Sequence, residues 1–152
     1  MAKKRTKSKS KPTAAKKKVS LKPSKQNKII FGSLLIVLSI ALFFSFMSYY
    51  FTWQADQSLL SEFANRNAEA SNLLNKFGAS VSHFFMYRGF GLASFAFPVL
   101  FAVTGLYLFL GLSGKGLIGK WIWGLVGVIW ISVALGFFAI DQPLLGGLIG
   151  YE

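Results

Sequence analysis

The sequence predicts an all-α membrane protein with three complete transmembrane helices, the start of a fourth, and a disordered basic N-terminal tail. The 152 residues are 53% hydrophobic and 16% aromatic, and only 14% are charged, against about 25% in soluble domains. Three stretches, residues 29–55, 89–114 and 121–140, contain no charged side chain. Each is long enough to cross a bilayer, because a helix needs about 20 apolar residues to do so.

Residues 1–28 form the predicted tail. They hold twelve of the 17 Lys and Arg residues and no acid, so the net charge of +12 belongs to this segment. Lys, Ser and Pro offer little apolar surface to bury, which favours disorder. The tail either fixes the orientation of the chain or also binds anionic lipid or nucleic acid. No aromatic residue is interleaved with the lysines, so a base-stacking surface is not predicted.

The first transmembrane helix is predicted over residues 29–51, as an uncleaved signal anchor. The stretch is longer than a secretory h-region, and no small-x-small cleavage site closes it. Its far end carries Tyr49, Tyr50 and Trp53, which is typical of the aromatic belt at a membrane interface. The loop at 52–75 follows, with three acids and one arginine.

Residues 76–87 are predicted to form a helix that lies at the membrane interface. They are apolar but hold Lys76, and Arg88 follows. Joined to the next stretch they would exceed a simple crossing, and arginine is costly in lipid. The second crossing is therefore predicted over 89–111, with a kink at Pro98. One long tilted helix is the alternative.

The third crossing is predicted over residues 121–140, and a fourth helix begins at about residue 146 and is cut off by the end of the sequence. Small residues on the third crossing favour close helix packing, either within the chain or between copies of it. These residues are Gly124, Gly127, Ala134 and Gly136.

The charges of the loops predict the orientation. The tail and the basic loop at 112–120 are expected in the cytoplasm, whereas the acidic loop at 52–75 and residues 141–152 are expected outside. Three alternating crossings satisfy all four assignments. The predicted location is the inner membrane, with several crossings and a cytoplasmic N-terminus.

No catalytic, cofactor-binding or metal-binding residue is predicted. Residues 114–120 match the G-x-x-x-x-G-K part of a phosphate-binding loop, but Trp121 stands where Ser or Thr would hold magnesium. His83 is the only histidine, and an interfacial structural role is the favoured interpretation. The chain has no cysteine. The predicted spans contain no Asp, Glu, Lys or Arg, which argues against transport.

Several short motifs resemble the N-terminal membrane domain of the FtsK/SpoIIIE-type bacterial DNA translocases. The basic tail, anchor helix, polar loop and closely spaced apolar helices follow that family's layout. Asn75-Lys76 departs from it, since many members carry another Gly there. The matching residues are Gly78-Ala79, Phe90-Gly91 with Pro98 seven residues after the Gly, and Gly146-Gly147-Leu148-Ile149-Gly150.

The resemblance implies a four-helix anchor that is followed by a linker and an ATP-driven hexameric motor, both absent from this chain. The motor would use ATP and magnesium to pump double-stranded DNA through the division septum, coupling chromosome segregation to cell division. The lipid bilayer, division-septum proteins and further copies of the chain are the implied partners.

Two alternatives remain open from the sequence. One is a small transporter or channel subunit, which charged or strongly polar residues within the spans would favour, although the spans contain none. The other is a stand-alone membrane protein whose basic tail binds lipid.

Overall fold

The computed structural model describes residues 24–59, 69–138 and 142–152. Every regular element in these parts is a helix, so the prediction of an all-α fold is confirmed. The predicted tail falls outside the described residues except for its last part, which forms the first turn of α1 instead of remaining disordered. The elements are α1 (Lys25–Leu59), α2 (Asn75–Ser82), η2 (His83–Phe90), η3 (Gly91–Phe95), α3 (Ala96–Phe109), α4 (Leu117–Phe138) and α5 (Pro143–Tyr151).

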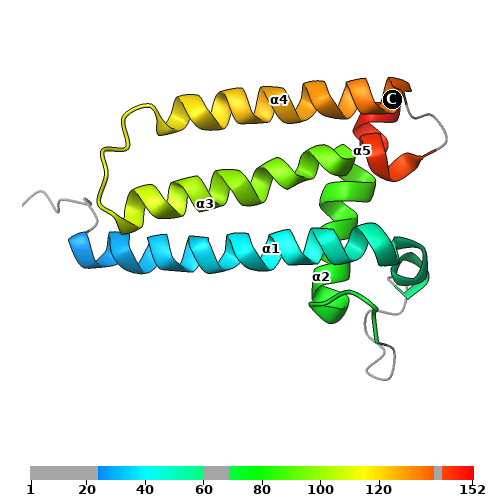
Figure 1. Ribbon diagram of the computed structural model, residues 1–152, viewed down its shortest axis with the longest axis horizontal. Coiled ribbons are helices and arrows are strands. Elements are labelled where there is room, and N and C mark those ends of the chain that lie inside the picture. The colour runs from blue at the N-terminus through cyan, green and yellow to red at the C-terminus, as the bar shows by residue number, and fades with distance from the viewer. Residues whose placement is uncertain (1–23, 60–68, 139–141) are drawn as a thin grey trace, which may run out of the picture.

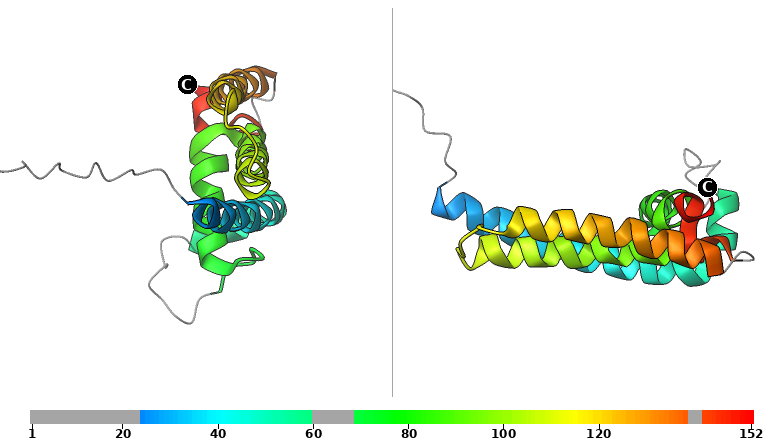
Figure 2. Two further views of the ribbon diagram at one scale, coloured as in Figure 1. Left: turned by 90° about the vertical axis from the view of Figure 1, so that its left-hand side faces the viewer. Right: turned by 90° about the horizontal axis from the view of Figure 1, so that it is seen from above.

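The three long helices α1, α3 and α4 lie side by side, with α3 between the other two (Figure 1). The end view in Figure 2 shows α2 and η2 crossing this layer on one side. We call α2 and η2 together the transverse segment. The end of the layer that holds Lys25 and the loop at 110–116 is named the basic end. The opposite end, which holds Trp53, the transverse segment and α5, is named the aromatic end.

Helix α1 is longer than the predicted crossing at both ends. It begins at Lys25 and continues to Leu59, so it includes Asp56, which the sequence analysis had placed in a loop. The apolar part, within Lys25–Asp56, is long and hydrophobic enough to span a membrane. Its large side chains are widely exposed along the helix, as expected for a surface that faces lipid.

Two glycines bring α1 and α3 into backbone contact. A Cβ atom on Gly32 would lie 2.5 Å from the Phe109 nitrogen, and one on Gly105 would lie 2.8 Å from the Gly32 oxygen. The Ser39 hydroxyl, further along α1, donates to the Pro98 carbonyl at 2.8 Å. Small residues at this interface allow close packing where apolar surface alone gives no driving force in lipid.

The second apolar stretch is broken, but not at Pro98. Residues Asn75–Phe109 are apolar enough for a span, yet the backbone leaves helical geometry at Gly89 (φ −99°, ψ −115°) and again at Gly91 (φ 59°). Pro98 lies in the first turn of α3, where a missing N–H costs nothing. The predicted kink at Pro98 is therefore wrong, since glycine makes the bend.

The 3-10 helix η3 and α3 together form the second crossing. Five residues at about 2 Å each and 14 at about 1.5 Å reach roughly 30 Å, which matches the hydrocarbon core. The transverse segment, residues 75–90, is not part of this crossing and lies across the layer. It includes the range 76–87 that was predicted for an interfacial helix.

A tight turn at the basic end joins α3 to α4, with Gly111 and Gly116 at positive φ (67° and 83°). After the turn, Trp121 Nε1 donates to the Thr104 hydroxyl at 2.9 Å, and the Trp121 ring meets Phe101 edge-on at 5.4 Å. Helix α4 is the third segment that can span a membrane.

Helix α5 is short and broken. It begins at Pro143, three residues before the predicted start, with the proline at the first helical position, which suits its fixed φ. The backbone bends at Gly147 (φ 67°, ψ 179°). Figure 1 shows α5 folded back beside the end of α4 and against the transverse segment.

Candidate interaction site at the aromatic end

Glycines join α5 to α4 by direct backbone contact. A Cβ atom on Gly136 would collide with the Gly150 carbonyl, and one on Gly146 would lie 2.6 Å from the Gly136 Cα. The Ser132 hydroxyl donates to the Gly146 carbonyl at 2.6 Å, and Ser132 is fully buried. No larger side chain fits between these two helices without moving one of them.

A second glycine contact joins α5 to the bend before α3. A Cβ atom on Gly147 would lie 2.5 Å from the Gly91 nitrogen, and one on Gly91 would collide with the Leu145 carbonyl. Both residues have positive φ, which glycine adopts without steric cost. We call the five residues of these two contacts the glycine clasp: Gly91, Gly136, Gly146, Gly147 and Gly150. Four of them belong to the motifs that resemble the translocase family.

A buried polar cluster attaches the chain after the loop to α1. The Asn72 amide donates to the Ser45 carbonyl at 2.9 Å. The Ser45 hydroxyl donates to the Asn72 side-chain oxygen at 3.3 Å and also bonds the Ser82 hydroxyl at 2.9 Å. Gly78 lies against this cluster, because a Cβ atom added to it would lie 2.8 Å from the Ser45 hydroxyl oxygen. All of these residues are buried, so the cluster fixes where α2 meets α1.

Asp56 makes a second polar attachment. Its side chain is fully buried, accepts a hydrogen bond from the Thr52 hydroxyl at 2.6 Å, and accepts another from the Ser71 amide at 2.7 Å. Throughout the described residues, no buried side-chain nitrogen or oxygen lacks a partner. A carboxylate with two donors is well satisfied, so Asp56 holds the end of the loop on α1.

An aromatic ladder lies beside these polar contacts. The Tyr49 hydroxyl and His83 Nδ1 form a hydrogen bond of 2.9 Å. The His83 ring stacks on Tyr87 at 5.0 Å, and Tyr87 stacks on Trp53 at 5.9 Å. The only histidine is therefore a bridge between α1 and the transverse segment, which agrees with a structural role. No group of three or more His, Asp or Glu within the described parts could hold a metal.

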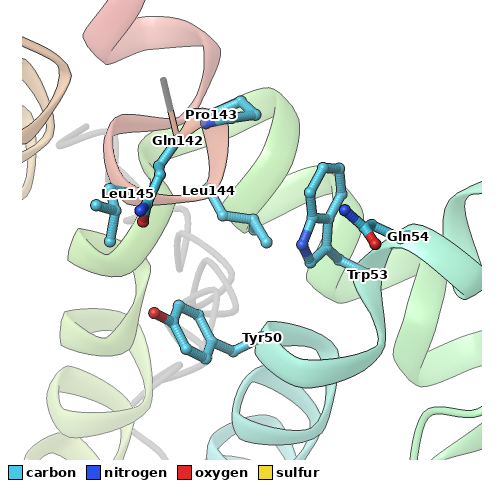
Figure 3. Close-up of a pocket in the computed structure, with 7 residues that line it drawn as sticks. All are labelled: Tyr50, Trp53, Gln54, Gln142, Pro143, Leu144 and Leu145. Atoms are coloured by element: carbon cyan, nitrogen blue, oxygen red, sulfur yellow. The ribbon is translucent and has the colours of Figure 1, made fainter. Parts of the chain in front are cut away.

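Between α1 and α5 lies an open cavity of about 310 Å³. Figure 3 shows Tyr50 and Trp53 projecting from α1 and Leu144 pointing toward them from α5. None of the lining residues is charged, and Tyr50, Trp53, Gln54 and Gln142 have polar side-chain atoms. Such a lining suits an uncharged occupant. The lining residues are Tyr50, Trp53, Gln54, Gln142, Pro143, Leu144 and Leu145.

Residues 114–120, which match part of a phosphate-binding loop, lie at the opposite end of the molecule. Gly116 lies in the turn between α3 and α4, and Gly119 and Lys120 lie in the first turn of α4. Helix α3 precedes the turn where a phosphate-binding loop would follow a strand. Among the motif's glycines, Gly116 alone has positive φ.

The small residues of α4 serve contacts within the chain at two positions. Gly136 belongs to the glycine clasp, and a Cβ on Gly124 would meet the Leu100 side chain at 2.9 Å. Gly127 faces open space, with nothing within 4 Å of an added Cβ. Packing within the chain therefore accounts for Gly124 and Gly136.

The polar attachments were not predicted from the sequence. Asp56 was assigned to a loop, although Thr52 and Asp56 are four residues apart and share a helix face. Ser45 and Ser82 carry no motif, and only the tertiary structure shows that they meet Asn72.

A family model described as the 4TM region of DNA translocase FtsK/SpoIIIE matches residues 24–152. No curated protein and no solved structure matches the chain. The match covers every described helix, including the glycine clasp. This chain therefore belongs to the FtsK/SpoIIIE family and contains that family's membrane-anchoring 4TM region.

Proposed function

We propose that this chain anchors an ATP-driven DNA translocase in the bacterial inner membrane at the division septum, so that chromosome segregation is coupled to cell division. The observation that carries the proposal is the family match over residues 24–152. ATP hydrolysis, magnesium binding and DNA pumping would belong to a hexameric motor that follows the anchor in the same polypeptide. The chain itself would supply attachment and position.

The proposed orientation places the basic end in the cytoplasm and the aromatic end outside. Lys25 and Lys28, at the start of α1, and Lys115, in the turn before α4, lie at the basic end, whereas Glu69, before α2, and Glu152, after α5, lie at the aromatic end. Lysine and arginine near membrane crossings favour the cytoplasmic side.

Septal proteins are the proposed partners of the aromatic end. This end presents the uncharged cavity between α1 and α5, with aromatic and amide groups in its lining. Aromatic residues in a partly enclosed pocket are common anchors for protein contacts.

Two observations test the anchor proposal. The gene should continue past Glu152 into an apolar helix, a polar linker and a complete G-x-x-x-x-G-K-[ST] motif. A fluorescent protein fused to Met1 should collect at the septum of dividing cells, and a fusion of an unrelated three-span protein is the control. A uniform membrane signal, or a stop codon directly after Glu152, would contradict the proposal.

Single cysteines test the orientation, because the chain has none of its own. Ser61→Cys should react with a membrane-impermeant thiol reagent in intact cells. Ser113→Cys, in the turn at the basic end, should react only after lysis. The reverse pattern would overturn the orientation and leave the anchor function untouched.

A further inference from the structure

The outer face of the transverse segment is largely exposed in the described structure. Gly78, Ala79 and Met86 form its inner face and are buried. On the other side, Phe77 and Phe84 are 67% and 64% exposed, and Arg88 is exposed as well. The segment is thus two-sided, with small and apolar residues toward the protein and two phenyl rings and a guanidinium away from it.

Helix geometry places these three exposed side chains on one stripe. Phe77 and Phe84 are about two α-helical turns apart. Arg88 follows Phe84 by roughly one turn of the wider helix η2. A cation therefore lies at the end of an exposed aromatic row.

Contacts with α1 fix the depth of the segment in the bilayer. The transverse segment meets α1 at Tyr49, through His83, and at Trp53, through Tyr87. Tyr49 lies about 30 Å along α1 from Ile29, at 1.5 Å per residue. That distance equals the thickness of the hydrocarbon core. The segment consequently lies at the level where acyl chains give way to headgroups.

The orientation of the segment limits what can cover its outer face. It crosses the long helices instead of running along them (Figure 2), so a helix that spans the bilayer would touch it over a short length only. Helices that lie in the interface of anionic membranes combine exposed aromatic side chains with cations. Phe77, Phe84 and Arg88 give the transverse segment this combination. The guanidinium matches phosphate oxygens in a bidentate geometry.

We propose that the outer face of the transverse segment is a lipid-binding surface for anionic phospholipid: Phe77 and Phe84 insert at the acyl boundary, and Arg88 binds the headgroup phosphate. This interaction would hold the aromatic end at a fixed depth. It does not depend on the proposed motor or on septal location, because it requires only a chain that spans a membrane.

Hydrogen exchange of the whole chain in lipid nanodiscs tests the surface locally. Exchange of amides in residues 75–90 should be about fivefold slower in discs of half phosphatidylglycerol than in discs of pure phosphatidylcholine, since one basic side chain near an anionic surface contributes a factor of this size. Arg88→Gln should abolish the difference between the two lipids, and Arg88→Lys should retain part of it.

Three controls make the result decisive. Lys120→Gln, at the basic end, should leave the lipid dependence of residues 75–90 unchanged. Exchange in α4 reports whether each variant is folded. Phe77→Ser with Phe84→Ser should raise exchange of residues 75–90 in both lipids while α4 stays protected.

Three outcomes would overturn the proposal. The first is equal exchange of the unaltered chain in both lipids. The second is a lipid dependence that survives Arg88→Gln. The third is protection that follows the number of chains per disc instead of the phosphatidylglycerol content, which would assign the face to a second copy of the chain.

Discussion

The two ends of the helical layer are held together in different ways. At the aromatic end, α5 touches α4 and the bend before α3 through backbone atoms, and buried polar groups attach the transverse segment to α1. At the basic end, the turn at 110–116 is exposed, and an added Cβ on Gly111, Gly114 or Gly119 would meet nothing within 4 Å. Trp121 supplies the contact from α4 to α3 there.

The difference shows what glycine does in each place. In the turn at 110–116, glycine permits a bend, and there is room for a side chain. At the aromatic end, glycine permits backbones to approach, and there is no room, as is also the case where Gly32 and Gly105 join α1 to α3. In lipid, where apolar side chains gain little by burial against each other, close backbone packing and hydrogen bonds supply the stability. We therefore expect stability to depend more on the glycine clasp than on the glycines of the turn.

The largest effect is expected for Gly91→Ala. Its backbone (φ 59°, ψ −136°) lies in a region that costs about 1–3 kcal/mol for a residue with a Cβ, and the collision with the Leu145 carbonyl adds about 1–3 kcal/mol. The free energy of unfolding in detergent, followed by circular dichroism, should fall by the sum. Gly114→Ala at the basic end is the control and should change little. Equal losses for the two variants would remove the distinction between the ends.

Asp56→Ala should lower the free energy of unfolding by about 2–3 kcal/mol, because it removes the buried carboxylate that accepts hydrogen bonds from Thr52 and Ser71. Glu69→Gln, at an exposed acid before α2, is the matched control and should have no measurable effect. A tolerated Asp56→Ala would mean that Thr52 and Ser71 find other partners.

A matched pair on α4 sharpens the comparison within one helix. Gly136→Ala should cost about 1–2 kcal/mol, because overpacking against Gly150 outweighs the gain in helix propensity. Gly127→Ala has open space around it and should be neutral or stabilise by up to about 1 kcal/mol. Denaturant midpoints in one detergent measure both. Equal changes in the free energy of unfolding for the two variants would show that the backbone contact at Gly136 does not stabilise the fold.

The smallest effect is expected for Tyr49→Phe. It removes one hydrogen bond to His83 and leaves the ring packing, so the loss should be about 1 kcal/mol. A double-mutant cycle with His83→Ala measures the coupling, which should account for most of that loss. Zero coupling would show that the two side chains act independently.

Much of the fold could be predicted because it depends on hydropathy and length. The uncharged stretches predicted the three long apolar segments, and the charged residues at 76 and 88 set the transverse segment apart from the next crossing. The exact break could not be predicted in this way. Pro98 is the stronger signal in sequence, yet it fits the first turn of α3, and the bend needs the positive φ of Gly91.

The sequence by itself determined that the chain spans a membrane and where its apolar helices lie, because transfer into lipid depends on composition over about 20 residues. Its short glycine motifs also indicated the family. Only the tertiary structure decided that α5 folds back on α4, that Asp56 is buried, and that Ser45, Asn72 and Ser82 meet. The physical reason is that such contacts join residues far apart in the chain, and close backbone approach depends on the shape of both partners.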